Sequence, residues 1–265
     1  MRCVAFWLAS LISACAGERL EVGLLDQKVI EQRLAKGLVS YDQREATVAD
    51  LFREAGCTVQ LQKVSGHSEN VICTLPGESN DPIIVGGHYD FISKGQGIID
   101  DWSGAAMLVS LYQSLKTHPR KHTFVFVAFA QEEVALNGSR KYVHSLSREQ
   151  LSGIRAFVNL ECLGTSPLKV WGSRATPELL QDLERIAATF KTSVPIVNVD
   201  KVGDDDSRPF LDAKVRVITL HSITQQTIAW LHTKLDRLDA IRIQDYYDSY
   251  KLIAFFLTYL DSIPR

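Results

Sequence analysis

The sequence predicts one α/β domain with a mixed, mostly parallel central sheet and helices on both faces. Continuous apolar runs, typical of strands buried on both sides, alternate with amphipathic helical stretches. An early pair of short strands around a tight turn indicates some antiparallel pairing. The chain has 265 residues, which suits one substantial core better than two domains.

The expected elements follow one another from Glu18, where polar, helix-forming sequence begins. A helix is predicted over 42–55, with Gly56 at its C-terminal cap. The antiparallel strands are expected at 58–64 and 70–75, around Ser65-Gly66. Further strands are predicted at 83–87, 123–130, 156–160, 168–172 and 215–220, and helices at 103–116, 134–145, 177–190 and 244–261.

The composition excludes several classes of protein. Hydrophobic residues make up 46% and charged residues 23% of the chain, which excludes a disordered protein or a coiled coil. The formal net charge is −2, so the chain has no basic field to hold a polyanion. We therefore expect no nucleic-acid partner.

Residues 1–16 are predicted to be an export signal, and residues 17–265 to form the folded domain. Arg2 precedes an apolar run over 4–12 that is too short to cross a bilayer, and small residues follow it. The alternative is a buried N-terminal helix or strand.

Two kinds of processing fit this segment, and both export the protein to the periplasm or the exterior. Ile12-Ser13-Ala14-Cys15 resembles a bacterial lipobox, whose cysteine is acylated and anchors the chain to a membrane. Ala14-Cys15-Ala16 also fits ordinary cleavage that releases the chain at Gly17. We favour the lipoprotein, because Cys15 has no evident role in a core.

Of the five cysteines, three lie beyond this segment, so at most one bridge can form among them. Cys57 and Cys73 flank the predicted hairpin and could pair, and Cys162 is the third.

Histidines and carboxylates follow the predicted strands at the points where these end. His88 and Asp90 follow the first apolar strand, Glu132 and Glu133 the second, and Glu161 the third. Because the carboxyl ends of parallel strands share one edge of a sheet, these side chains are expected to lie close together. Asp100 opens the helix after the first strand, and His232 comes after the last strand. Imidazole and carboxylate donors suit zinc.

Each of these residues also has an ordinary structural interpretation. Asp100 or Asp101 could cap a helix, and Glu132 and Glu133 could be first-turn carboxylates favoured by the helix dipole. Glu161 is harder to explain in this way, because apolar residues flank it on both sides. An unpaired buried carboxylate costs several kcal/mol, and a metal ion removes that cost.

Five sequence motifs, in their order along the chain, resemble those of the co-catalytic di-zinc aminopeptidases of the secreted bacterial type. This family is related to glutamate carboxypeptidases and glutaminyl cyclases. The resemblance covers residues from about Asn70 to the C-terminus. The motifs are Gly87-His88-Tyr89-Asp90, Asp100-Asp101-Trp102-Ser103-Gly104, Glu132-Glu133 with Leu136-Asn137-Gly138-Ser139, Asn159-Leu160-Glu161-Cys162-Leu163-Gly164, and Leu231-His232-Thr233 with Asp236.

The resemblance implies a zinc exopeptidase fold and a role for each residue. Asp100 would bridge two Zn²⁺ ions, because a carboxylate can span two metals and an imidazole cannot. His88 and Glu161 would complete one zinc site, and Glu133 and His232 the other. Glu132 would be the general base, and Asp90 would hold His88 in place. The implied reaction is the hydrolysis of N-terminal peptide bonds of peptide substrates.

The sequence departs from the family at two points. Glu161 stands where many of these aminopeptidases carry Asp. Asp206-Ser207-Arg208-Pro209-Phe210 resembles a segment in which the family has a His, and Arg208 is expected in its place. Substrate specificity is expected to lie in loops near Trp102, residues 223–230 and Arg208.

Two other functions remain open at this point. A single-zinc glutaminyl cyclase would share the His-Tyr-Asp and Glu-Glu elements. A catalytically inactive binding module on the same scaffold is the second alternative, although all five ligand positions and the base are filled.

Overall fold

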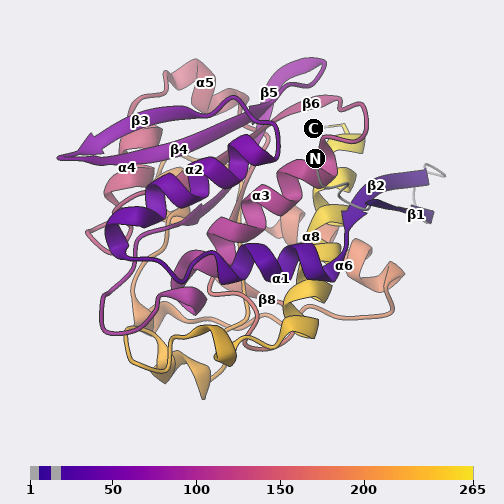
Figure 1. Ribbon diagram of the computed structural model, residues 1–265. Helices are drawn as coiled ribbons and strands as arrows, with labels where there is room; N and C mark the ends of the chain where they lie inside the picture. The colour runs from indigo at the N-terminus through magenta and orange to yellow at the C-terminus, as the bar shows by residue number, and fades with distance from the viewer. Residues whose placement is uncertain (1–5, 13–18, 265) are drawn as a thin grey trace.

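The computed structural model describes residues 6–12 and 19–264, and a seven-stranded sheet lies at its centre (Figure 1). The strand order is β3-β4-β6-β5-β7-β9-β8. The four central strands, β6, β5, β7 and β9, run parallel, and the outer strands β4 and β8 pair antiparallel with them. The predicted mixed, mostly parallel sheet is confirmed. The strands are β3 Gln60–Ser65, β4 Ser68–Leu75, β5 Ser79–His88, β6 His122–Phe129, β7 Ala156–Glu161, β8 Lys169–Ala175 and β9 Val217–His221.

Successive side chains of the central strands are apolar and point to opposite faces of the sheet. Helices therefore cover both faces. Phe124 and Phe126 of β6 pack into the larger core on one face, whereas Val127 and Phe129 pack into a smaller core on the other. The larger core lies under α1 Gln27–Ala35, α2 Arg44–Glu54, α3 Ser103–Leu115, α6 Pro177–Thr189 and α8 Ile243–Ser262. The smaller lies under α4 Asn137–His144, α5 Arg148–Gly153 and α7 Ser207–Asp212.

The N-terminal region contains a two-stranded sheet beside α8 (Figure 1). β1 Phe6–Ile12 pairs antiparallel with β2 Arg19–Leu25. The prediction of a helix-forming stretch from Glu18 was wrong, because Leu20, Val22 and Leu24 alternate with the period of a strand and are buried. The Tyr250 hydroxyl accepts a hydrogen bond from the Leu25 N–H at 2.9 Å, which ties β2 to α8.

Residues 6–12 form strand β1, and the export signal stays a prediction. Ser13, Ala14 and Cys15 of the lipobox lie outside the described residues. Within the described ranges, none of the helices combines the length and the apolar character that a bilayer crossing requires.

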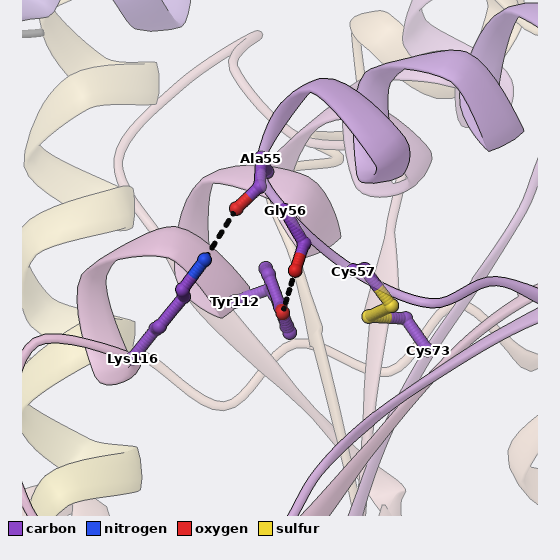
Figure 2. Close-up of a disulfide and its surroundings, with 6 residues drawn as sticks. All are labelled: Ala55, Gly56, Cys57, Cys73, Tyr112 and Lys116. Atoms are coloured by element: carbon purple, nitrogen blue, oxygen red, sulfur yellow. Dashed lines mark hydrogen bonds between the residues drawn. A yellow bond between two sulfur atoms is a disulfide. The ribbon is translucent and has the colours of Figure 1, made fainter.

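A disulfide between Cys57 and Cys73 joins the segment after α2 to strand β4 (Figure 2). Figure 2 also shows two hydrogen bonds from α3 to the end of α2: Lys116 Nζ donates to Ala55 O at 3.0 Å, and the Tyr112 hydroxyl donates to Gly56 O at 3.1 Å. These contacts satisfy carbonyl groups that the helix end leaves without partners. The pairing that the sequence allowed is thus present.

We predict that replacing both cysteines, Cys57→Ser with Cys73→Ser, lowers the free energy of unfolding by about 3 kcal/mol, because the bridge closes a loop of 16 residues in the unfolded chain. Urea unfolding measures this difference. Wild-type protein in excess reductant is the matched control and should unfold like the double variant. Equal stability of the oxidised wild type and the variant would contradict the prediction.

Candidate metal centre

The parallel strands deliver the predicted site residues to one edge of the sheet. His88 is the last residue of β5 and pairs in register with Phe129, the last residue of β6. Glu161 ends β7 and pairs with His221 at the end of β9. A pocket of about 350 Å³ lies at this edge, and its lining includes Asp100, Glu132, Glu133, Glu161 and His232. The structure therefore brings the predicted ligands and the predicted base together.

The two oxygens of Asp100 face two different histidines. Asp100 Oδ1 lies 3.2 Å from His88 Nε2, and Asp100 Oδ2 lies 3.0 Å from His232 Nε2. A second carboxylate approaches each histidine: Glu161 Oε1 lies 3.7 Å from His88 Nε2, and Glu133 Oε1 lies 3.0 Å from His232 Nε2. Ligands about 2.0–2.2 Å from a tetrahedral zinc ion lie roughly 3.3–3.6 Å apart. Both donor sets have spacings close to this range.

Two buried atoms of the cluster make no hydrogen bond, and both are predicted metal donors: His88 Nε2 and Glu133 Oε1. A buried polar atom without a partner is costly, and a metal ion would remove that cost. The other ring nitrogen, His88 Nδ1, lies 3.1 Å from the carbonyl oxygen of Asp90. Donation to this carbonyl leaves Nε2 with a lone pair for a metal. The residues present fit the implied metal centre.

The cluster carries excess negative charge, and the pKa values of its histidines show this. The neighbouring carboxylates of Asp100 and Glu133 raise the pKa of His232 to about 10. Burial alone would lower the pKa of His88, but the carboxylates around it, Glu132 foremost, raise it well above its usual range. Such a site favours a divalent cation, which neutralises several carboxylates at once.

Asp90 holds the double-glutamate turn as well as His88. Its carboxylate oxygens accept hydrogen bonds from the backbone N–H groups of Glu132 at 3.0 Å and Glu133 at 3.2 Å. Its carboxylate also lies 3.5 Å from His88 Nδ1, the contact that the resemblance implies. Asp90 thus fixes the positions of both glutamates, a role that the sequence did not reveal.

The turn after β6 differs from the predicted helix over 134–145, because α4 begins only at Asn137. Ala135 and Leu136 have φ values of 60° and 59°, which an α-helix does not allow. Gly138 then passes so close to β6 that a Cβ atom would lie 2.3 Å from Ala130 O. The resulting loop, not a helix, carries Glu132 and Glu133.

Asn70 of β4 fastens this loop to the sheet. Its Oδ1 accepts a hydrogen bond from the Ala130 N–H at 3.0 Å, and its Nδ2 donates to Gly138 O at 2.9 Å. Asn70 is fully buried, so both bonds are shielded from water. The sequence analysis missed this residue, since an Asn at the start of a strand carries no distinctive signal.

Asp101, joined to Asp100 by a cis peptide bond, is a second residue to which the sequence analysis gave no role beyond a helix cap. Its side chain accepts hydrogen bonds from the backbone N–H groups of Gly104 at 3.0 Å, Cys162 at 2.9 Å and His88 at 3.2 Å. Burial raises the pKa of this carboxyl well above its usual range. Asp101 links the start of α3 to the ends of β5 and β7, and so positions the three predicted ligands beside it.

Asp236 connects the loop of His232 to the loop before Asp100. Its Oδ1 accepts a hydrogen bond from the Ile99 N–H at 2.7 Å, and its carbonyl oxygen accepts one from the Gln96 N–H at 2.7 Å. Burial raises the pKa of Asp236 to about 6. This contact explains why Asp236 accompanies the closing histidine motif.

Apolar side chains line the pocket beside the carboxylates. Only some of them belong to the loops in which the sequence analysis expected substrate specificity to lie. Ile223 is one of them, whereas Trp102 is fully buried elsewhere and donates a hydrogen bond to Arg33 O. The apolar lining residues that pack together are Cys162, Trp171, Val199, Ile223 and Leu231.

Arg208 does not occupy the place of a site residue, so that prediction was wrong. Its side chain is 42% exposed, and its guanidinium pairs with Asp212 at 3.0 Å. The chain turns Asp206 and Ser207 inward instead, because α7 begins at Ser207 and directs Arg208 to the solvent. Burial raises the pKa of Asp206 to about 8.

His221 is buried at the end of β9 and packs as a neutral residue. Its Nε2 lies 3.0 Å from Val197 O, and its Nδ1 accepts a hydrogen bond from the Ile223 N–H at 3.1 Å. Burial lowers the pKa of His221 to about 4 from its usual 6.5.

We predict that His221 makes the protein less stable in mild acid. The pKa of His221 is 6.5 in the unfolded chain and about 4 in the folded chain. As the pH falls from 6.5 to 4, the unfolded chain therefore binds a proton at His221 that the folded chain does not bind, and the free energy of unfolding decreases. The loss amounts to about 3 kcal/mol. His221→Gln should be less stable at pH 7, and its difference from the wild type should shrink by this amount at pH 4. Parallel stability curves in urea unfolding would contradict the prediction.

The fold and the site together define an α/β protein with a candidate metal centre at the carboxyl edge of its sheet. The sequence profile of peptidase family M28 matches residues 70–257, and the chain belongs to this family. The resemblance inferred from the five motifs is thereby confirmed.

The chain is similar in sequence to named aminopeptidases of this family. The chain is 26% identical to aminopeptidase YwaD of Bacillus subtilis over 203 residues, which cover 72% of the chain and 44% of YwaD. It is 32% identical to the probable lipoprotein aminopeptidase LpqL of Mycobacterium tuberculosis over 138 residues, 46% of the chain and 28% of LpqL. The chain thus spans less than half the length of these curated relatives.

A solved glutaminyl cyclase from an Acidobacteriales bacterium shares the fold. Its TM-score is 0.74 at 19% identity, and the match covers 89% of this chain and 94% of the cyclase. The fold alone therefore does not separate an aminopeptidase from a cyclase.

Proposed function

We propose that the protein is a metallo-aminopeptidase that hydrolyses N-terminal peptide bonds at a centre of two zinc ions. The observation that carries the proposal is Asp100, whose two oxygens face His88 and His232 separately. Glu161 would complete the site of His88, and Glu133 that of His232. When bound, the zinc pair supplies Lewis acidity that polarises the scissile carbonyl and acidifies the attacking water.

Glu132 is the proposed general base. It lines the pocket, and its Oε2 lies 3.8 Å from His88 Nε2, so its carboxylate is beside the donor set of His88. Burial raises the pKa of Glu132 well above its usual range, which suits a group that must accept a proton. Glu132 takes a proton from the attacking water and returns it to the departing amine as the C–N bond breaks. The apolar side chains of the pocket, Trp171 and Leu231 among them, would receive the first side chain of the substrate.

A substrate panel on zinc-loaded protein tests this function. Peptides with a free N-terminal apolar residue should be cleaved, and the same peptides with a blocked N-terminus should not. C-terminally free peptides with a blocked N-terminus test for carboxypeptidase action, and N-terminal glutaminyl peptides test for cyclisation. Cleavage restricted to blocked peptides, or no turnover at all, would contradict the proposal; the second result would favour an inactive binding module.

Glutaminyl cyclisation at one zinc is the second candidate, and one observation favours it. Asp100, Glu133 and His232 form a compact group by themselves, with donor atoms within 4.8 Å of one another. Conversion of a glutaminyl substrate with loss of ammonia, and no peptide cleavage, would establish this function.

We also propose that the protein is exported and tethered through an acylated Cys15. The Cys57–Cys73 disulfide supports export, because such bonds persist mainly in oxidising compartments. The similarity to LpqL, whose name includes "lipoprotein", agrees with a tether. Mass spectrometry of the native N-terminus should find a lipid-modified Cys15. An unmodified Gly17 start would refute the tether, and an intact Met1 would refute export by either route.

A further inference from the structure

The pocket at the candidate metal centre carries one charged side chain that the proposed reaction does not use. Arg140 lies in the first turn of α4 and lines this pocket. Among the lining residues within the described ranges, Arg140 is the only lysine or arginine. Six carboxylates line the same pocket, those of Asp100, Glu132, Glu133, Glu161, Asp204 and Asp205. Arg140 is thus a permanent cation in an acidic cavity.

The guanidinium of Arg140 is held at one nitrogen and leaves two others available. Arg140 Nε donates a hydrogen bond to Ala135 O at 3.0 Å, and the side chain is exposed. Its two Nη groups have no acceptor among the residues that the structure describes. Arg174 and Arg208, by contrast, both pair with Asp204. A guanidinium in this state can bind a carboxylate through two parallel hydrogen bonds.

The leaving half of a peptide substrate should pass this guanidinium. The proposed base, Glu132, returns a proton to the departing amine, so that amine must lie beside Glu132. The Leu136 N–H donates to Glu132 O at 2.9 Å and closes the turn that carries the base. Arg140 is tied to the same turn through Ala135. Because the first side chain of the substrate occupies the apolar part of the pocket, the second residue comes closer to Arg140.

We propose that Arg140 binds a carboxylate of the residue that follows the scissile bond, and that it thereby sets the substrate class of the enzyme. The inference rests on the proposed aminopeptidase function and deepens it. In a dipeptide this carboxylate is the free C-terminus, and in a longer peptide it is the side chain of an Asp or Glu in second place. The acidic lining repels such a group, since like charges raise the free energy of the complex. Arg140 offsets this repulsion.

Two matched pairs of substrates, assayed on the zinc-loaded full chain, test the proposal. Leucyl-alanine against leucyl-alanine amide reports the C-terminal carboxylate, and leucyl-glutamate amide against leucyl-glutamine amide reports the side chain. In at least one pair the wild type should favour the carboxylate about 10-fold in kcat/KM, as for one charge-assisted hydrogen bond. Arg140→Gln should remove this preference mainly by raising KM, because the contact is equally strong in the ground state and the transition state.

The controls separate this contact from a general disturbance of the turn. Lys141→Gln is the same loss of charge at the next residue of α4, which does not line the pocket, and it should keep the preference. Arg140→Lys keeps the charge without the planar fork and should retain part of it. The ratio within a pair cancels any loss of activity that both peptides share. In the wild type, added salt should weaken the preference, because screening weakens an exposed ion pair.

The outcomes distinguish this proposal from the proposed function. Equal kcat/KM within both pairs in the wild type, or an unchanged preference in Arg140→Gln, would overturn the role of Arg140 and leave the aminopeptidase standing. A wild-type preference that did not weaken with salt would also overturn it, even if the glutamine variant failed to fold. No turnover of any of the four peptides would overturn both proposals.

Discussion

Glu132→Gln should lower kcat on aminoacyl substrates by at least about 10²-fold while both zinc ions stay bound, because removal of a general base typically costs 10²–10⁴-fold. Gln is isosteric with Glu and cannot accept the proton of the attacking water. Asp90 binds the backbone N–H groups of the turn, not the Glu132 side chain, so the turn itself should be unchanged.

The matched control is Glu149→Gln, the same change on the surface helix α5. It should leave kcat, KM and zinc content at wild-type values. Steady-state kinetics with metal analysis on all three proteins separates the loss of a base from the loss of metal. Near-normal turnover of Glu132→Gln would refute the assignment of the base.

Asp100→Ala should abolish the binding of both zinc ions, whereas His88→Ala and His232→Ala should each lose one. The prediction follows from the contacts of Asp100, which is the residue of this cluster shared by both histidines. We expect about two zinc ions per wild-type chain, one in each histidine variant, and none in Asp100→Ala. Activity should fall to background in Asp100→Ala.

Metal analysis after dialysis, with circular dichroism to verify folding, measures these ratios. His144→Ala on α4 serves as the control and should keep both ions. A wild type that holds one ion, lost in His232→Ala and kept in His88→Ala, would refute the two-metal centre and favour the single-zinc cyclase.

The fold and the convergence of the predicted ligands at one sheet edge were predictable, because both depend on short-range patterns. Apolar runs such as that before His88 mark buried parallel strands, and the residue after such a run must lie at the carboxyl edge. Glu161 could be recognised because a carboxylate between apolar neighbours needs a partner. The five predicted ligands follow from these patterns and from the order of the motifs.

What the sequence did not predict depends on backbone geometry and on distant contacts. The left-handed residues Ala135 and Leu136 are ordinary helix formers, so propensity predicted a helix where tertiary contacts impose a loop. Asn70 lies 60 residues before its partner Ala130, and nothing local to either residue indicates the bond. Arg208 was placed by analogy with a motif, whereas the start of α7 determines its direction.

The predicted ligands come from segments that begin at His88 and end at His232, and each lies on a different loop or strand end. Metal uptake would therefore act as a cross-link that closes long stretches of chain at one point. No fragment that stops short of residue 232 could assemble both donor sets, so metal affinity would report that the whole sheet edge has formed. Free-energy linkage then requires zinc to raise the melting temperature of the folded chain as its concentration increases, and chelators to lower it.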